Sequence, residues 1–360
     1  MRFHVIALPH TQTARGFSAC AFNEKVRKFC IMMKALEHTV YLYASEHNEA
    51  PCDEHIACIS EAERVASLGG KHYTEASFDN TLPHWRAFNA RAIMGIRARA
   101  EPRDFICVIG GLSHKPIADA FPGMMTVEFG IGYPGTFAKY RVWESYAWMH
   151  TCYGAANRNP AAIDGIWFDA VIPSYFEPEK FPFRLDKDDY YLFIGRMIER
   201  KGVHIASEIC ERAGKRLVLA GPGKPPRYGE HVGEVGPEQR GKLMAGAKAL
   251  IMPTTYIEPF GSVAPEAMMC GTPVICTDWG AMTETVVQGV TGFRCRTMSE
   301  FTQALDDVAD LNPMHIMQHA MERYSLDVCG KLYQSYFERL STLWDAGWYS
   351  ERNPAKTAVG

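Results

Sequence analysis

The N-terminal half of the chain alternates short apolar runs with amphipathic stretches. Apolar runs bounded by turn residues predict buried strands, and they lie at Arg2–Leu8, Thr39–Ala44, Phe105–Ile109 and Met124–Glu128. From Ser18 onward, apolar side chains recur every three or four residues, which predicts a helix with one apolar face; its members are Phe22, Val26, Phe29, Met33 and Leu36. This β–α–β order indicates a parallel sheet with helices on both faces.

The same order starts again in the second half. Predicted strands lie at Tyr190–Ile194, Arg216–Ala220, Ala249–Met252 and Val274–Thr277. Predicted helices lie at Val203–Ala213, Glu238–Ala247 and Val263–Cys270, with Gly214 and Gly271 where two of them end. The segment Pro173–Arg184 is rich in proline and fits neither period, so it predicts a linker.

We therefore expect two doubly wound α/β domains of similar size. Residues 1–172 form the first domain, 173–189 the linker and 190–335 the second domain. From Leu326 onward, apolar residues again recur at helical spacing, so the chain should end in helices, with the segment after Asn353 frayed.

Composition and charge narrow the class of protein. Of 360 residues, 47% are hydrophobic, which is enough for two cores and excludes a largely disordered chain. A formal net charge of −3 argues against a broadly basic nucleic-acid-binding protein. No apolar run is long enough for a membrane helix, and the N-terminal strand does not resemble a signal peptide. Eleven cysteines without a Cys-x-x-Cys pair argue against a disulfide framework or a zinc site, so we expect a cytoplasmic protein.

The first candidate site lies between a predicted strand and a predicted helix. There Gly195-Arg196 and Lys201-Gly202 place two cations where the carboxyl end of a parallel strand meets a helix start. Ligands of open α/β sheets gather at this edge, and a diphosphate needs charge-assisted contacts of this kind. Taken alone, the run is also consistent with a solvated charged loop.

The second candidate site opens the helix predicted at Val263. Glu258 stands in the loop before this helix and Glu266 stands in its opening turns, and the first free amides of the helix belong to Ser262, Val263 and Ala264. Two carboxylates placed in this way can accept hydrogen bonds from two hydroxyl-bearing groups while the amides hold a phosphate. Either glutamate could instead compensate the helix dipole.

Together the two clusters resemble the retaining glycosyltransferases of family 4. Besides the residues above, Pro253-Thr254 and the run Ala267-Met268 to Pro273-Val274 carry the resemblance. Downstream, Gly280, Glu284, Gly289 and Thr291-Gly292-Phe293 are similar to the closing segment of that family. The resemblance implies a GT-B fold, in which two Rossmann-like domains face a cleft and a C-terminal helix, here within 336–360, returns to the first domain.

The resemblance also implies roles for individual residues. By motif position, Arg196 and Lys201 hold the donor diphosphate, next to Gly195. Glu258 binds hydroxyls of the donor sugar and Glu266 binds the ribose. The backbone amides offered to the donor come from Gly261, Ser262 and Val263.

The N-terminal half follows the family only in outline. Gly16, in the loop Thr11–Phe17, resembles the glycine that family members place beside the donor phosphates. Glu128 stands where the family often has a histidine that touches the sugar, which makes Glu128 a candidate catalytic residue, with His114 and His150 as alternatives. Four aromatic residues are candidates for stacking on an acceptor, although core packing also explains their spacing: Tyr140, Trp143, Tyr146 and Trp148.

These assignments predict a metal-independent enzyme that transfers a sugar from a nucleotide-diphosphate sugar, UDP or GDP being the expected nucleotide. The acceptor is expected to be a small molecule, a lipid or a polysaccharide. The loop residues Pro9–Thr13 and the run Val127–Tyr133 also look like a phage-type branch of the family, some of whose members modify hydroxymethyl-pyrimidines in DNA. In that case a basic face would be formed by Arg86, Arg91, Arg97, Arg99 and Arg103.

Other classes remain open at this point. A non-catalytic nucleotide-sugar sensor would bind the donor without turnover. A dehydrogenase is disfavoured because no Gly-x-Gly-x-x-Gly motif opens a predicted helix; Gly221-Pro-Gly223 is followed by Lys-Pro-Pro. The paired glutamates and the short chain also disfavour a pyridoxal-dependent phosphorylase and an epimerase, and the sequence leaves the oligomeric state open.

Overall fold

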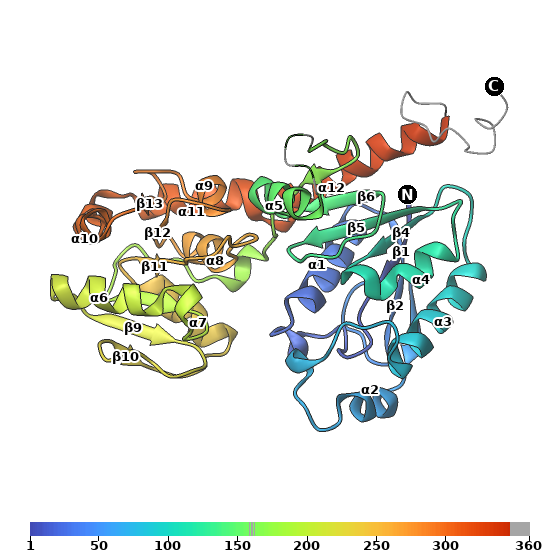
Figure 1. Cartoon of the computed structure of the whole chain (residues 1–360), viewed down its shortest axis with the longest axis horizontal. Helices are drawn as coiled ribbons and strands as arrows, with labels where there is room; N and C mark the ends of the chain where they lie inside the picture. The colour runs from blue at the N-terminus through green and yellow to red at the C-terminus, as the bar shows by residue number, and fades with distance from the viewer. Residues whose placement is uncertain (158, 160, 162, 346–360) are drawn as a thin grey trace. The chain divides into compact units, whose positions relative to one another are not determined.

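The chain folds into two units, each built around its own parallel sheet (Figure 1). The computed structural model describes residues 1–345 apart from 158, 160 and 162. One unit holds residues 1–143, 164–172 and the segment from 326, and the other holds 144–163 and 173–325. We call them the N-terminal unit and the C-terminal unit.

The sheet of the N-terminal unit has the order β3-β2-β1-β4-β5-β6-β7. Every pairing is parallel, and the order reverses beside β1, which lies between β2 and β4. The strands are β1 (Arg2–Ile6), β2 (Thr39–Ser45), β3 (Glu54–Ile59), β4 (Phe105–Val108), β5 (Met125–Ile131), β6 (Tyr140–Trp143) and β7 (Ala170–Val171). Loops after β1 and β4 therefore flank the switch point where open α/β sheets bind ligands.

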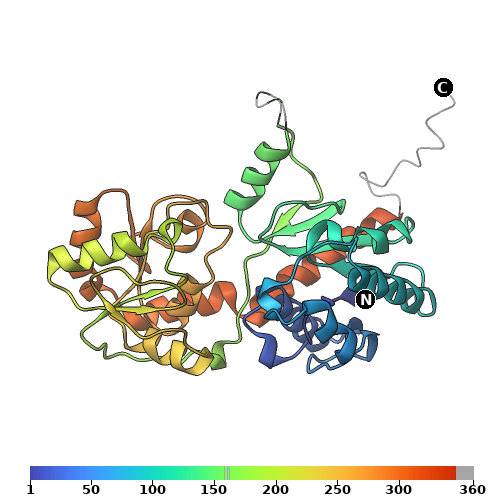
Figure 2. The ribbon, with the colours of Figure 1, turned by 60° about the horizontal axis from the view of Figure 1, so that its bottom comes forward.

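Helices cover both faces of this sheet. On one face, Phe88 and Ile96 of α3 (Pro83–Arg97) and Ile117 of α4 (Lys115–Asp119) pack against the strands, next to the short α2 (Glu61–Leu68). On the other face, Phe29 of α1 (Ala21–Ala35) contacts Phe129, with ring centroids 4.5 Å apart, and Tyr333 of α12 (Leu326–Ser341). Figure 2 shows α12, in red, beside α1 of the same unit. The C-terminal helix is thus part of this core.

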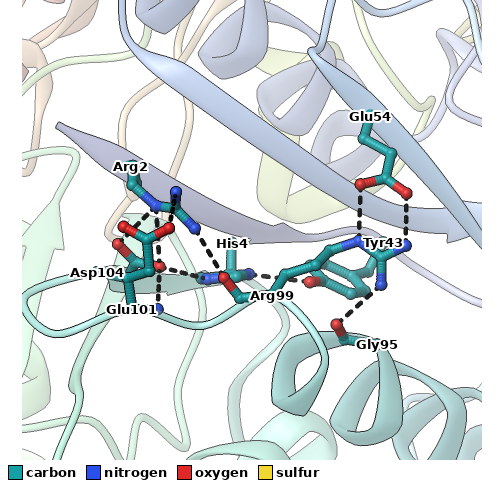
Figure 3. A network of polar contacts seen from close by, with 8 residues as sticks. All are labelled: Arg2, His4, Tyr43, Glu54, Gly95, Arg99, Glu101 and Asp104. Carbon is teal, nitrogen blue, oxygen red and sulfur yellow. Dashed lines mark hydrogen bonds and ion pairs between the residues drawn. The ribbon is translucent and has the colours of Figure 1, made fainter.

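A buried polar network ties the first strands together at their amino-terminal end (Figure 3). The ring of His4 lies between the hydroxyl of Tyr43, 2.9 Å from Nδ1, and the carboxylate of Asp104, 3.0 Å from Nε2. Asp104 also accepts a hydrogen bond from Arg2 at 3.0 Å, and Arg99 is ion-paired with Glu54 beside them. Because burial lowers the pKa of His4, the ring is uncharged at neutral pH. These contacts stabilise the amino-terminal edge of the sheet, whereas ligands of open α/β sheets bind at the carboxyl edge.

The sheet of the C-terminal unit has the order β10-β9-β8-β11-β12-β13, again with parallel pairings. Its switch point lies between β8 and β11. The strands are β8 (Tyr191–Ile194), β9 (Leu217–Ala220), β10 (Glu230–His231), β11 (Leu250–Met252), β12 (Val274–Thr277) and β13 (Gly292–Cys295).

Two apolar cores lie on the two faces of this second sheet. One contains residues of α6 (Val203–Ala213) and α10 (Met298–Asp307). The other contains residues of α7 (Pro237–Gly246), α8 (Val263–Met269) and α11 (Pro313–Tyr324). Two further helices of this unit, α5 (Tyr146–Ala156) and α9 (Met282–Thr285), lie at its carboxyl edge.

Most of the predicted elements are present, with bounds shifted by a few residues. The helix predicted from Ser18 begins at Ala21, and the strand predicted at Met124–Glu128 extends to Ile131. The helix that joins the first core begins at Leu326, ahead of residue 336. The tail expected to fray after Asn353 lies outside the described residues. Within the described part of the chain, no helix is both long and apolar enough to span a bilayer.

Candidate active site

Two loops meet at the carboxyl edge of the C-terminal sheet, after β8 and after β11. Gly202, which starts α6, has a φ of +76°, and a Cβ there would overlap the carbonyl oxygen of Pro253. The carbonyl of Arg200 accepts hydrogen bonds from the Thr255 amide at 3.0 Å and the Thr254 hydroxyl at 3.2 Å. Glycine is required at 202 both by this backbone approach and by the left-handed conformation. The two predicted motifs are thus held together by main-chain contacts.

This junction places Lys201 directly against Glu258. The ammonium nitrogen of Lys201 lies 3.0 Å from one carboxylate oxygen of Glu258 and 2.9 Å from the other. Both side chains are largely buried, at 22% and 11% exposed. The predicted phosphate-binding cation and the predicted sugar-binding carboxylate are therefore neighbours.

Arg196 lies on the same edge, two residues after Ile194, the last residue of β8. Its side chain is exposed, while the adjacent backbone is fixed because the Met197 amide donates to the Pro222 carbonyl at 2.8 Å. Gly195 and Gly221 touch through their backbones, since a Cβ on Gly221 would overlap the Gly195 carbonyl. An exposed guanidinium on a fixed backbone is suited to an anionic ligand.

Glu266 occupies the first turns of α8 and is held by a residue that the sequence did not single out. Arg240, on α7, donates to one carboxylate oxygen of Glu266 at 2.7 Å. Glu266 itself is 6% exposed. Arg240 lies outside every recognised motif, and only the packing of α7 beside α8 reveals its role.

The segment before α8 has the backbone shape expected of it. Gly261 has a φ of +79°, and its carbonyl accepts the Ala264 amide at 2.9 Å. Ser262 precedes the helix, and its carbonyl accepts the Glu266 amide at 3.2 Å. The amides of Ser262 and Val263 therefore come before the first of these N–H···O bonds, whereas the Ala264 amide, which was also predicted to be free, donates to Gly261.

Tyr256 is a second residue that sequence reasoning missed. Its ring centroid lies 4.2 Å from the guanidinium carbon of Arg200 and 5.1 Å from the ammonium of Lys201. Burial, followed by a hydrogen bond and the charge of Glu258, raises the pKa of its hydroxyl. The sequence signal that could have found Tyr256 is an aromatic residue two positions before Glu258.

The start of α5 is joined to the loop that carries Glu258. Ser145 donates its hydroxyl to the Pro259 carbonyl at 2.6 Å. Glu284 accepts the amides of Tyr146 at 2.9 Å and Ala147 at 2.7 Å. Glu284, in the predicted closing segment, thus acts here as a helix cap and complements the helix dipole.

In the N-terminal unit, Glu128 is fully buried in the middle of β5. One of its oxygens accepts the Tyr133 hydroxyl at 2.9 Å, and the other accepts the amides of Phe137 at 3.1 Å and Ala138 at 3.3 Å. Burial raises the pKa of Glu128. These contacts hold the loop after β5 in place.

Gly16, the predicted glycine beside the donor phosphates, is exposed, and its carbonyl accepts the Tyr73 hydroxyl at 3.4 Å.

The two alternative histidines have different surroundings. His114 is fully buried against Trp85, donates its Nδ1–H to the side-chain oxygen of Asn89 at 2.9 Å, and has its pKa lowered to about 3 by burial. His150 is exposed on α5, between Tyr146 and Tyr153. His114 is therefore a core residue of the N-terminal unit.

The aromatic candidates also divide between core and surface. Tyr140 and Trp143 are buried in the N-terminal unit, at 4% and 1% exposed, whereas Tyr146 is exposed.

Of the arginines considered for a basic face, Arg91 is paired with Glu63 and Arg99 with Glu54. Among the described residues, no group of three or more His, Cys, Asp or Glu side chains is arranged to hold a metal ion.

Comparison with known proteins identifies the C-terminal half. Residues 188–310 match the family model described as "Glycosyl transferases group 1", and this range contains every candidate residue around Lys201, Glu258 and Glu266. Residues 188–310 are thus similar to group 1 glycosyltransferases. The matched range starts just before β8 and ends after α10.

Curated relatives match the same region. An uncharacterized glycosyltransferase of Methanocaldococcus jannaschii is 33% identical over 124 residues, which cover 30% of this chain and 32% of its own length. A glycogen synthase of Pseudomonas aeruginosa is 27% identical over 205 residues, which cover 48% of this chain and 38% of its own length. The chain thus spans well under half of the length of these relatives. These matches give no support to the narrower resemblance to a phage-type branch.

Solved structures match over nearly the whole chain. AviGT4, a glycosyltransferase involved in avilamycin A biosynthesis, aligns with a TM-score of 0.69 and 19% identity over 95% of this chain and 98% of its own. The Anabaena protein HepE, solved with UDP and glucose, aligns with a TM-score of 0.62 and 16% identity over 95% of this chain and all of its own. Together with the two parallel sheets and the return of α12 to α1, these likenesses confirm the predicted GT-B fold.

Proposed function

We propose that the chain transfers a sugar from a nucleotide-diphosphate sugar to an acceptor hydroxyl, with retention of anomeric configuration. The observation that carries the proposal is the arrangement of Lys201 against Glu258 at the carboxyl edge of the C-terminal sheet. There, Arg196 and the start of α8 lie on the same edge as this pair. Such an edge combines cations for a diphosphate with carboxylates for sugar hydroxyls.

Each group has a distinct part in the proposed reaction. Arg196 and Lys201 neutralise the diphosphate, and the charge that develops on it as it leaves is stabilised by groups already in place. Glu258 accepts hydrogen bonds from the transferred sugar. Glu266, held by Arg240, accepts them from the ribose.

The stereochemical proposal needs no protein nucleophile and no resident metal. The departing phosphate oxygen takes the proton of the acceptor hydroxyl on the same face from which it leaves, so catalysis rests on positioning and charge stabilisation. No Asp-x-Asp pair stands among the motif residues to bind a divalent cation; Asp186-Lys187-Asp188 lies in the segment before β8, where Asp188 is ion-paired with Arg184. Glu128 is enclosed by its three hydrogen-bond donors, which supports a bracing role for it rather than a chemical one.

For the donor, we propose UDP or GDP as the nucleotide, and the UDP bound to HepE supports the former. The proposed acceptor is a small molecule, a lipid or a polysaccharide, with the protein in the cytoplasm. Hydroxymethyl-pyrimidine DNA and membership of the phage-type branch remain the alternative, but the pairing of Arg91 and Arg99 with glutamates reduces the basic face on which that alternative depends.

A donor screen tests the proposed function. Thermal unfolding with UDP-, GDP-, ADP- and dTDP-sugars should show stabilisation by one nucleotide class, because a ligand that binds only the folded state raises its stability. Release of free sugar from that donor should follow. Stabilisation without any turnover, across a panel of acceptors, would instead indicate a nucleotide-sugar sensor.

A further inference from the structure

We propose that Tyr256 is a positioning residue of the donor site, whose ring holds Arg200 and Lys201 and whose hydroxyl holds the Glu258 carboxylate. The inference rests on the proposed function and extends it to a residue outside the recognised motifs. Tyr256 lies between the end of β11 and Glu258, in the loop that touches the Lys201 loop at Gly202.

The ring of Tyr256 contacts both cations of the first loop. The guanidinium carbon of Arg200 is 4.2 Å from the ring centroid and the ammonium nitrogen of Lys201 is 5.1 Å from it. A cation within about 6 Å of an aromatic face is attracted to the negative potential of that face. The Arg200 backbone is itself fixed by Thr254 and Thr255, so the ring meets cations whose main chain is already in place.

The hydroxyl of Tyr256 acts on the other partner. After burial, a hydrogen-bonding interaction with Glu258 and the charge of Glu258 are the causes that raise the pKa of this hydroxyl. The ring of Tyr256 contacts Lys201, and we assign its hydroxyl to the Glu258 carboxylate, so that one side chain acts on both members of the pair.

Donor binding makes this double contact necessary. Without a donor, Lys201 and Glu258 satisfy each other. Once a diphosphate attracts Lys201, the carboxylate loses part of its stabilisation and would be free to rotate. The Tyr256 hydroxyl then keeps Glu258 aimed at the sugar, while the ring keeps Lys201 at the phosphate.

Two substitutions separate the ring from the hydroxyl. Tyr256→Phe keeps the ring, so UDP should bind within about twofold of wild type by calorimetry, while hydrolysis of UDP-glucose should fall about tenfold in kcat. Tyr256→Leu removes both contacts, so UDP should also bind about five- to tenfold more weakly. GDP and GDP-mannose replace these probes if the donor screen selects guanosine. Tyr228→Phe is the matched control, because Tyr228 donates its hydroxyl to the Lys215 carbonyl elsewhere in the same unit.

A measurement without nucleotide separates this inference from the proposed function. The rate at which an acylating reagent labels Lys201, followed by mass spectrometry, should rise at least about threefold in Tyr256→Leu and stay at the wild-type value in Tyr256→Phe. Wild-type labelling in Tyr256→Leu would overturn the role of the ring, and wild-type kcat in Tyr256→Phe would overturn that of the hydroxyl. Failure of the wild-type protein to bind any nucleotide sugar would overturn the proposed function, while the labelling result would still decide the ring contact.

Discussion

Lys201 and Glu258 form an ion pair in which the lysine nitrogen lies 2.9 and 3.0 Å from the two carboxylate oxygens. Each residue thereby avoids the cost of burying an unpaired charge. The pair also keeps both groups in place before the donor arrives. Removing either residue is therefore expected to affect the other, which shapes the predictions below.

Replacing Lys201 with alanine should weaken nucleoside diphosphate binding. Charge-assisted contacts contribute roughly 1.5–3 kcal/mol each, so calorimetry with UDP should show a loss of about ten- to hundredfold in Lys201→Ala. Lys242→Ala is the control, because Lys242 forms an exposed pair with Glu238 on α7. Unchanged affinity in Lys201→Ala would remove the phosphate role of this residue.

The two carboxylates should differ in what they bind. Glu266→Gln should weaken free UDP and UDP-sugar alike, because its proposed partner is the ribose. Glu258→Gln should leave free UDP nearly unaffected while it lowers turnover, because its proposed partner is the sugar and the glutamine carbonyl can still accept a hydrogen bond from Lys201. Calorimetry and steady-state hydrolysis measure the two effects, and equal losses of free-UDP affinity in both variants would contradict this division.

The transferred sugar should keep its anomeric configuration without a metal. Proton NMR of the product from a donor of known anomer gives the configuration, and activity in EDTA should match that in buffer alone. An inverted product would exclude the proposed mechanism. Loss of all activity in EDTA would exclude its metal-free part.

Glu128→Gln completes this test. Because the carboxylate accepts three hydrogen bonds that fix the loop after β5, its loss should lower the free energy of unfolding by about 1–3 kcal/mol and preserve retention. Transfer abolished in a variant that folds and binds donor normally would instead give Glu128 a chemical role.

Gly202→Ala should damage the donor site more than the same change at Gly214. Both glycines have positive φ, but a Cβ at 202 would overlap the Pro253 carbonyl, whereas nothing lies within 4 Å of a Cβ at 214. Gly214→Ala should cost only about 1 kcal/mol of stability from its backbone conformation. Urea unfolding and UDP calorimetry should show the larger loss of both stability and affinity in Gly202→Ala.

Two buried histidines should make the protein less stable in mild acid. Burial lowers the pKa of His10 to about 4 and that of His114 to about 3, against 6.5 for the unfolded chain. Below pH 6.5 the unfolded state therefore binds more protons, so each histidine removes up to about 1.4 kcal/mol of stability per pH unit until its folded pKa is reached.

Urea unfolding between pH 7.5 and 4.5 measures this effect. His10→Gln and His114→Gln should each reduce the pH dependence by about one proton. An identical pH dependence in wild type and in both variants would show that carboxylates, rather than these rings, govern the acid response.

The sequence by itself predicted the elements whose bounds follow from local residue patterns. Buried strands such as β8 and β12 are continuous apolar runs, and helices such as α6 end at a glycine, so their bounds follow from local rules. The proposed donor-site residues were singled out by their place at one sheet edge and by their resemblance to family 4 motifs. The sequence analysis left β3, β6, β7, β10 and β13 unpredicted, because β7 and β10 have only two residues each and the other three carry polar or charged positions.

Tertiary structure alone decided which residues support those that were predicted. Arg240 reaches Glu266 from another helix, and Tyr256 reaches Lys201 across a contact between two loops far apart in sequence. It also placed Glu128 and His114 in the interior, where burial and hydrogen bonds rather than residue type set their properties. Local periodicity predicts which face of a helix or strand a residue occupies. It does not predict which side chain from a distant segment contacts that residue, because such contacts form only when the sheet and its helices pack.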